Sequence, residues 1–153
     1  MDYMKKSKKE ERTGTNVLIY CRVSSDEQAK GGSLDFQEER LRKHCCDNGY
    51  NIIDFECRED ESAKTVEKRP TLQKILNYVR KNRGKVDKLL FLRWARFTRD
   101  MISGVETMKE LLSLGVEPNA IEAPLDYSSE TWPLLLGVHI GLAQGDNIKS
   151  YLL

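Results

Sequence analysis

The chain has 153 residues, of which 32% are charged and 39% are hydrophobic, and its formal net charge is +1. This length is sufficient for one domain with a substantial core. No apolar run approaches the about 18 residues that a membrane-spanning helix needs, and the N-terminus lacks the apolar segment of a signal peptide. We therefore expect a soluble, cytoplasmic protein with no membrane partner.

Charge is unevenly distributed at the N-terminus. The run Lys5-Lys6-Ser7-Lys8-Lys9 leads into Glu10-Glu11-Arg12, and we expect residues 1–15 to be a disordered basic leader. An ordinary solvated terminus is favoured here over an arm that touches nucleic acid. Because DNA binding needs clustered Lys and Arg, the net charge of +1 argues against strong DNA affinity of this segment alone.

The cysteines and histidines do not have the spacing of a zinc site. Cys45 and Cys46 are adjacent, no C-x2-C occurs, and His44 and His139 are far apart in the sequence. We expect no metal and no cofactor. The four cysteines lie in or beside predicted regular elements, which favours reduced thiols: Cys21, Cys45, Cys46 and Cys57.

The first predicted elements are a strand and a helix. Val17–Cys21 is a short apolar run with β-branched and aromatic residues, which predicts a buried strand. A polar loop over 26–32 follows. Ser33 has the position of an N-cap for a helix over 34–47, and Gly49 is its expected end.

The middle of the chain predicts a second strand, a loop and a second helix. Residues 50–55 alternate in part and predict a short strand. Residues 58–68 contain seven charged residues without an apolar period, which predicts an exposed loop. Pro70 suits the first turn of the next helix, whose apolar stripe has helical spacing: Leu72, Ile75, Leu76 and Val79.

The second half repeats this alternation. Gly84 ends the helix, and 88–92 and 119–123 predict the third and fourth strands. Between them lies an amphipathic helix that ends near Gly115, marked by Met101, Val105, Met108, Leu111 and Leu112. From Trp132 onward the pattern is helical again.

Strands that alternate with helices predict right-handed crossovers and a mainly parallel sheet. We expect a three-layer α/β domain over 16–130, with a central sheet of about four to five strands. Residues 131–153 begin a long C-terminal helix.

Arginines and serines follow three of the predicted strands. These segments are Arg22 to Ser25, the loop through Ser62 to Arg69, and Arg93 to Arg99. The carboxyl edge of an open α/β sheet is where ligands bind, and guanidinium groups match phosphoryl oxygens without needing a metal. Any one of these arginines is more often an ordinary surface residue. Their occurrence together with a serine weakens that interpretation.

Other phosphate chemistries do not match the sequence. No cysteine has an arginine six positions later, as cysteine phosphatases require, and Gly84-Lys85 continues into Val86 rather than a P-loop serine or threonine. No G-x-S-x-G elbow is present. A metal-free serine nucleophile that acts on phosphate remains.

Four motifs together resemble the catalytic domain of the serine site-specific recombinases, which are resolvases, invertases and their larger transposon and phage relatives. They are Tyr20-Cys21-Arg22-Val23-Ser24, Ser33-Leu34-Asp35-Phe36-Gln37, Arg69-Pro70 and Arg96-Phe97-Thr98-Arg99. The resemblance covers residues 16 to 153 and implies DNA recombination as the activity.

The resemblance also implies the site. Ser24 matches the nucleophile that forms a 5′-phosphoserine link, and the phosphate-binding positions are Arg22, Arg69, Arg96 and Arg99. Supporting positions are Tyr20, Gln37 and Ser62. The implied partners are double-stranded DNA and a second copy of the chain, in a homodimer that assembles into a tetramer, with neither metal nor ATP.

One position departs from the family pattern. Many members have an aspartate directly before the first arginine of R-x-x-R, whereas this chain has Ala95. The general acid and base are therefore unassigned. The alternative function is a catalytically weak domain of this fold that serves assembly or regulation on DNA.

The terminal helix has glycines at Gly137, Gly141 and Gly145. Each interior glycine costs about 1 kcal/mol relative to alanine, so their spacing indicates close approach of another element. Packing against this domain's own sheet is one interpretation, and the resemblance implies a dimer interface instead. Asp146 falls near an acidic position of that helix in the family that the chain resembles, and it is given a structural or supporting role only. We expect DNA-binding domains outside this chain to supply most of the DNA affinity.

Overall fold

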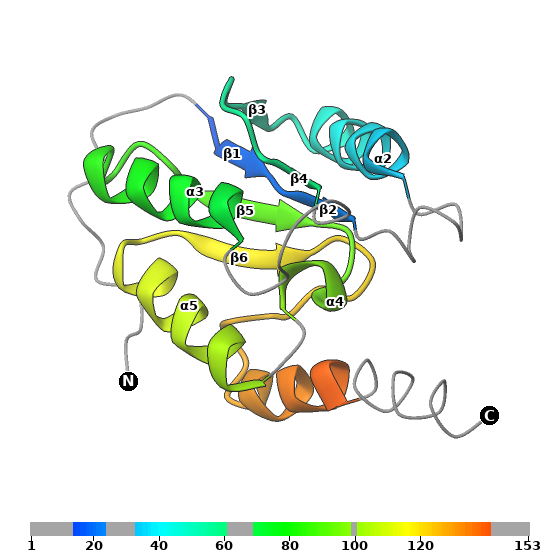
Figure 1. Cartoon of the computed structure of the whole chain (residues 1–153). Coiled ribbons are helices and arrows are strands. Elements are labelled where there is room, and N and C mark those ends of the chain that lie inside the picture. Colours follow the sequence, from blue (N-terminus) through cyan, green and yellow to red (C-terminus); the bar gives the residue numbers. More distant parts are fainter. Residues whose placement is uncertain (1–13, 24–32, 61–68, 99–100, 142–153) are drawn as a thin grey trace.

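A four-stranded parallel sheet forms the centre of the computed structural model (Figure 1). The structure describes residues 14–23, 33–60, 69–98 and 101–141. The strand order is β3 (Asn51–Ile52), β1 (Asn16–Ile19), β5 (Lys88–Phe91) and β6 (Glu117–Ala120), with every neighbouring pair parallel.

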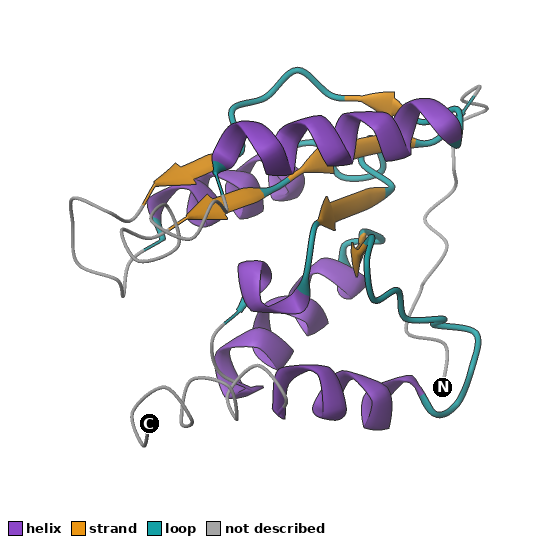
Figure 2. Cartoon of the chain, turned by 90° about the vertical axis from the view of Figure 1, so that its right-hand side faces the viewer, coloured by secondary structure: helices purple, strands orange, loops and turns teal. Residues whose placement is uncertain are grey.

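Helices cover both faces of this sheet (Figures 1 and 2). Helix α2 (Leu34–Asp47) lies on one face, where its Leu41 packs with Val17 and Ile19. Helices α3 (Pro70–Lys81) and α5 (Met101–Ser113) lie on the other face, where Leu18 joins their apolar side chains. The alternation along β1 is the period of two that a strand imposes. The predicted three-layer α/β fold with a parallel sheet is confirmed.

The helix boundaries follow from capping residues that the sequence predicts. The Ser33 side chain accepts a hydrogen bond from Phe36 N at 3.1 Å, which caps α2. The α2 helix ends before Gly49, whose φ of +68° favours glycine. In α3 the whole predicted apolar stripe is buried: Leu72, Ile75, Leu76 and Val79.

The first strand is divided in two at Tyr20. The Tyr20 amide donates to Leu90 O in β5 at 2.7 Å, but the Cys21 amide donates to Cys57 O at 3.1 Å. From Cys21 the chain continues as β2 (Cys21–Val23), which pairs in parallel with β4 (Arg58–Asp60) in a separate two-stranded sheet. The end of the predicted strand therefore leaves the central sheet.

The prediction of an exposed loop over 58–68 is wrong for its first three residues, which form β4. Glu59 in the middle of β4 is only 2% exposed, because β2 and neighbouring polar groups enclose it. A strand made of three charged residues has no apolar pattern to reveal it. Residues 61–68 lie outside the described residues.

Two other strands differ from prediction in their limits. β3 covers 51–52 rather than 50–55, and β6 covers 117–120 rather than 119–123. Pro118 lies inside β6, where it aligns with Leu89. This is possible because β6 is an edge strand, which tolerates the missing proline N–H.

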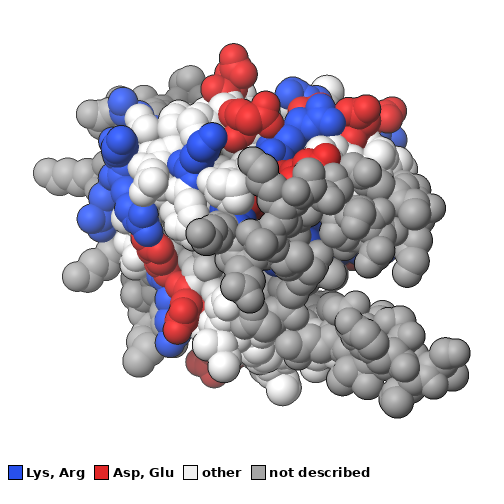
Figure 3. All heavy atoms as spheres, in the orientation of Figure 1, with Lys and Arg blue, Asp and Glu red and all other residues white. Residues whose placement is uncertain are grey.

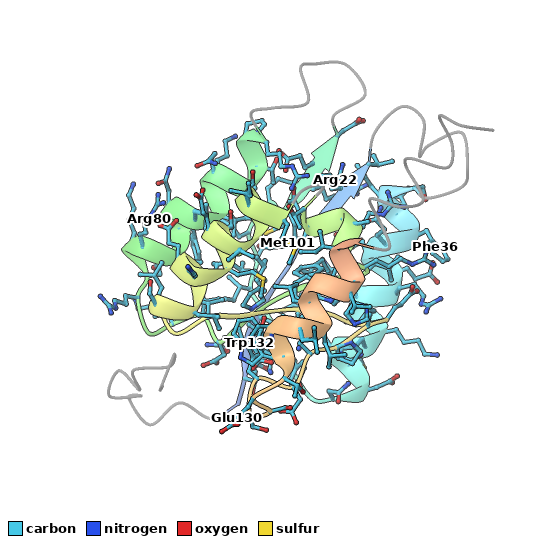
Figure 4. All side chains as sticks on the ribbon, turned by 90° about the horizontal axis from the view of Figure 1, so that it is seen from below. Arg22, Phe36, Arg80, Met101, Glu130 and Trp132 are labelled. Atoms are coloured by element: carbon cyan, nitrogen blue, oxygen red, sulfur yellow. The ribbon has the colours of Figure 1, made fainter. Side chains whose placement is uncertain are left out.

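The last described helix, 132–141, packs beside α5 (Figure 4). Its Leu136 and Ile140 are buried in the core that α3 and α5 share. A Cβ at Gly137 would lie 3.1 Å from Met101 Cε, whereas a Cβ at Gly141 would meet nothing within 4 Å. The close approach at Gly137 is thus to this chain's own α5 helix, and Gly145 lies outside the described residues.

The surface shows both signs of charge. Lys and Arg lie next to Asp and Glu on the face seen in Figure 3. Arg80 of α3 pairs with Glu110 of α5, and Arg58 pairs with Asp35 at 2.7 Å. Among the described helices, none is both long and apolar enough to cross a membrane.

Gly104 allows the segment before α5 to pack closely against that helix. A Cβ at Gly104 would lie 2.6 Å from Thr98 Cγ2 and 2.9 Å from Thr98 Oγ1. Thr98 is 4% exposed and has little room to move. Because Thr98 follows Arg96 by two residues, this contact also limits where the arginine-bearing segment can lie.

We predict that Gly104→Ala lowers the free energy of unfolding by about 1–3 kcal/mol through overpacking, despite the about 1 kcal/mol helix preference of alanine. Urea unfolding measures this change. The control Lys109→Ala, at an exposed position of the same helix α5, should stay within about 0.5 kcal/mol of the original chain.

A second variant tests the cause of that loss. Thr98→Ala removes the two atoms nearest to the added Cβ, so the double variant should lose less than the sum of the single variants. A Gly104→Ala chain as stable as the original would contradict the close-packing argument.

Candidate functional site

The site begins at β2, where Arg22 is held by a buried glutamine. The Arg22 amide donates to Gln37 Oε1 at 3.2 Å, and Gln37 Nε2 donates to Arg22 O at 2.9 Å. Gln37 is fully buried on α2. These two bonds hold the backbone of Arg22 in place. Arg22 lies in β2, two positions before Ser24 in the sequence.

The Arg22 side chain is also buried, with 1% exposure, and it reaches the short helix α4 (Trp94–Phe97). Arg22 Nε donates to Arg96 O at 2.9 Å, and Arg22 Nη2 donates to Ala95 O. The last carbonyls of a helix lack intrahelical partners, and positive charge is favourable beside them. The contact therefore gives hydrogen-bond partners both to the Arg22 guanidinium and to two carbonyls of α4.

Arg69 reaches the same end of α4 from another segment. Its Nη1 donates to Phe97 O. Arg69 is the N-cap residue of α3 and has φ 31° and ψ 65°, which is left-handed and unusual for a residue with a Cβ. Such backbone strain costs about 1–3 kcal/mol and is often found at functional sites.

Aromatic packing holds α4 against the sheet. Phe97 stacks on Phe91 of β5 with ring centroids 4.8 Å apart, and Trp94 meets the same ring edge-on at 5.0 Å. Trp94 Nε1 also donates to Ala123 O at 2.9 Å. Arg96 is thereby placed, partly buried, beside the carbonyls that receive Arg22 and Arg69.

Tyr20 and Glu59 form a second polar group, close to Arg22 and Arg69. The Tyr20 hydroxyl donates to Glu59 Oε2, and the Thr71 amide donates to Glu59 Oε1 at 3.2 Å. Burial and the Glu59 charge raise the pKa of the Tyr20 phenol above its ordinary value, while the Arg69 and Arg22 charges act in the opposite direction. Tyr20 is therefore a neutral hydrogen-bond donor close to both arginines.

The structure brings together several of the residues that the sequence predicts. The Arg22 and Arg69 side chains converge on the end of α4, of which Arg96 is a part; Gln37 bonds to the Arg22 backbone, and Tyr20 lies near the charges of Arg22 and Arg69. The other predicted residues lie outside the described residues: Ser24, Ser62, Arg99, Gly145 and Asp146.

Sequence reasoning missed Glu59 and the contact between Thr98 and Gly104. Glu59 stands between two charged neighbours in the predicted loop, and no sequence signal distinguishes it. Gly104 is a glycine inside a strong helical pattern, which is a signal for close packing. The glycine thus indicated a close contact, but nothing in the sequence identified Thr98 as the residue in contact.

The thiol next to Arg22 is not set up as a nucleophile. Burial raises the pKa of Cys21 to about 12, so this side chain is a neutral thiol at neutral pH. Within the described part of the chain, no three His, Cys, Asp or Glu side chains are grouped as a metal site requires. The guanidinium groups of Arg22 and Arg69 meet at the end of α4, and such groups suit an oxyanion such as phosphate.

Comparison with known proteins gives a match along most of the chain. The sequence profile of a family described as "Resolvase, N terminal domain" matches residues 17–147. The uncharacterized immunity region protein 3 of Bacillus phage phi105 is 41% identical over 71 residues, which are 46% of this chain and 85% of the phage protein.

Two solved structures share the fold. A resolvase family site-specific recombinase from Streptococcus pneumoniae has a TM-score of 0.64 and 22% identity, covering 90% of this chain and 91% of that one. The N-terminal catalytic domain of TP901-1 integrase has a TM-score of 0.62 and 21% identity, covering 87% of this chain and 97% of the other.

We predict that Gln37→Ala lowers the free energy of unfolding by about 2–4 kcal/mol, because it leaves the buried N–H and C=O of Arg22 without these partners. Urea unfolding measures the loss. Gln73→Ala is the matched control, since Gln73 is an exposed helical residue of α3, and it should change stability by less than about 0.5 kcal/mol. Equal losses in both variants would contradict a stabilising role of the two hydrogen bonds between Gln37 and the Arg22 backbone.

Proposed function

This chain belongs to the resolvase family of N-terminal domains, and we propose that it cleaves and rejoins DNA strands through a 5′-phosphoserine intermediate. The observation that carries the proposal is the convergence of the Arg22 and Arg69 side chains on α4, which carries Arg96, next to the strand that leads into Ser24. Residues 16–130 are the proposed catalytic unit, acting on double-stranded DNA in the cytoplasm.

In the proposed reaction the Ser24 hydroxyl oxygen attacks the phosphorus of the scissile phosphodiester. The new bond joins Ser24 to the 5′-phosphate, the bond from phosphorus to the 3′-oxygen breaks, and that oxygen gains a proton as the serine loses one. Rejoining is the reverse attack by a 3′-hydroxyl on the phosphoserine. The number of phosphate ester bonds is unchanged, so neither step needs ATP.

The arginines supply the charge that this step requires. A phosphodiester gains negative charge as the fifth oxygen approaches, and fixed guanidinium groups stabilise that charge most when they are already oriented. Arg22 and Arg69 are oriented by the α4 carbonyls, and Arg96 lies on α4 itself. Arg99 is proposed to complete the set. In this scheme the guanidinium groups take the place of a metal ion.

We predict that Ser24→Ala abolishes the covalent protein–DNA adduct, because it removes the attacking oxygen. The protein that contains this chain is incubated with duplex fragments of its source genome and denatured, and the DNA that remains attached to protein is collected and sequenced. Ser25→Ala is the matched control and should form the adduct at the original level.

An adduct that forms equally well with Ser24→Ala would contradict the mechanism. The second candidate function is a catalytically weak domain that serves assembly or regulation, and the methyl group of Ala95 at a usual aspartate position favours it. Retained DNA binding without any adduct from the original chain would support that function instead.

We also propose that the chain forms a homodimer that assembles into a tetramer on DNA, with residues 131–153 as the start of the dimer helix. An exposed apolar face lies along 132–141 and the adjacent end of α5: Met101, Ile102, Leu134, Leu135 and Val138. A Cβ added at Gly141 would meet nothing within 4 Å, which suits the approach of a second helix on that side. Gly145 is proposed to extend this face, and Asp146 to support the site from it.

We predict that Leu134→Glu and Gly141→Glu each weaken dimerisation by about 100-fold or more, because a symmetric interface would bury the new charge. Sedimentation velocity over a range of protein concentrations measures this. Phe36→Glu replaces an exposed aromatic residue on α2 and should leave the dimer intact. A monomer at every concentration of the original chain, free or on DNA, would contradict the proposed interface.

A further inference from the structure

Glu59 is a buried carboxylate that the proposed mechanism does not use. It lies in the middle of β4 with 2% exposure. Among the described acidic residues, it is the one that is buried to this degree. Because a buried charge is costly unless it is paired and hydrogen-bonded, its contacts indicate what it does.

Each carboxylate oxygen of Glu59 accepts from a different element. Oε2 accepts from the hydroxyl of Tyr20, between β1 and β2, and Oε1 accepts from the amide of Thr71 at 3.2 Å, in the first turn of α3. The Thr71 hydroxyl also donates to Arg58 O at 3.2 Å, so β4 and α3 are joined twice. Negative charge is favourable at this end of a helix.

The bond to Thr71 restricts the backbone of Arg69. Only Pro70 separates the two residues, and its ring fixes one of the intervening backbone angles. Arg69 itself is held in the left-handed region at φ 31° while its guanidinium donates to Phe97 O. Anchoring the Thr71 amide therefore leaves the chain little freedom to relax Arg69 toward an ordinary conformation.

We propose that Glu59 is a positioning residue for Arg69: its carboxylate joins Tyr20 to the start of α3 and so holds the strained Arg69 backbone and directs its guanidinium to the end of α4. The inference rests on the proposed function for its catalytic consequence. The positional consequence is independent of it. Glutamine does not reproduce these bonds, because it is neutral and has one acceptor oxygen: if that oxygen accepts from the Thr71 amide, the Tyr20 hydroxyl faces the amide nitrogen, and neither bond is charge-assisted.

The first experiment measures position directly. In Glu59→Gln, the Thr71 amide should exchange with solvent at least about 10-fold faster, since a charge-assisted bond is lost. The Nε–H order parameter of Arg69, from nitrogen-15 relaxation, should fall in the same variant. Glu59→Asp keeps two acceptors and the charge and should restore part of both values. Unchanged exchange and an unchanged order parameter would overturn the proposal.

The second experiment measures the rate of adduct formation at saturating protein, on the genomic duplex that the original chain attacks. Glu59→Gln should slow this step by about 10- to 100-fold through misplacement of Arg69, and Glu59→Asp should be intermediate. The control Glu106→Gln, which changes an exposed charge on α5, should react at the original rate. All variants are compared at a temperature where circular dichroism shows them folded.

A double variant separates positioning from a general structural role. If Glu59 acts through Arg69, then Glu59→Gln should cause no further slowing in an Arg69→Ala chain. Full additivity of the two losses would overturn the proposal. If the original chain forms no adduct at all, the proposed function fails, and the exchange and relaxation measurements still decide whether Glu59 positions Arg69.

Discussion

The burial of the Arg22 guanidinium is the constraint on which the site depends. At 1% exposure this charge needs partners inside the protein, and its partners are the carbonyls of Ala95 and Arg96. Removing a partner from a buried charge costs about 3–5 kcal/mol. β2 and the end of α4 therefore cannot move independently, although more than 70 residues separate them in the sequence. The two hydrogen bonds between the Gln37 side chain and the Arg22 backbone extend the same constraint to α2, so the positions of β2, α2 and α4 depend on one another.

Aromatic packing against the sheet holds α4 in the position where its carbonyls bond to Arg22. The rings of Phe91, Trp94 and Phe97 join α4 to the central strand β5. The missing side chain of Gly104 lets Thr98 lie directly against α5. The arginine-bearing segment is thus fixed from the sheet and from a helix, which leaves its carbonyls aligned for Arg22 and Arg69. Rigid positioning of this kind is what electrostatic stabilisation of a phosphate requires.

Much of this arrangement follows from the sequence, because apolar periodicity is a local signal. The buried run at Val17, the stripe of α3 and the family motifs predicted the fold and the resolvase family, and both are confirmed. The exit of the chain from the sheet at Tyr20 and the burial of Glu59 depend on partners far away in the sequence. Neither has a periodic pattern. The roles of Ser24 and the other residues outside the described ranges stay predictions.

The alanine at position 95 contributes no charge to the site. The side chain at position 95 is a methyl group, and the backbone carbonyl of Ala95 accepts from Arg22 Nη2. The buried negative charge is on the other side, at Glu59, where it faces Tyr20 and α3. Arg22 and Arg69 thus bring positive charge to the end of α4, and Glu59 holds a buried negative charge that Tyr20 and Thr71 contact. In the proposed reaction, a phosphate at this end of α4 would meet guanidinium groups that the α4 carbonyls have already oriented.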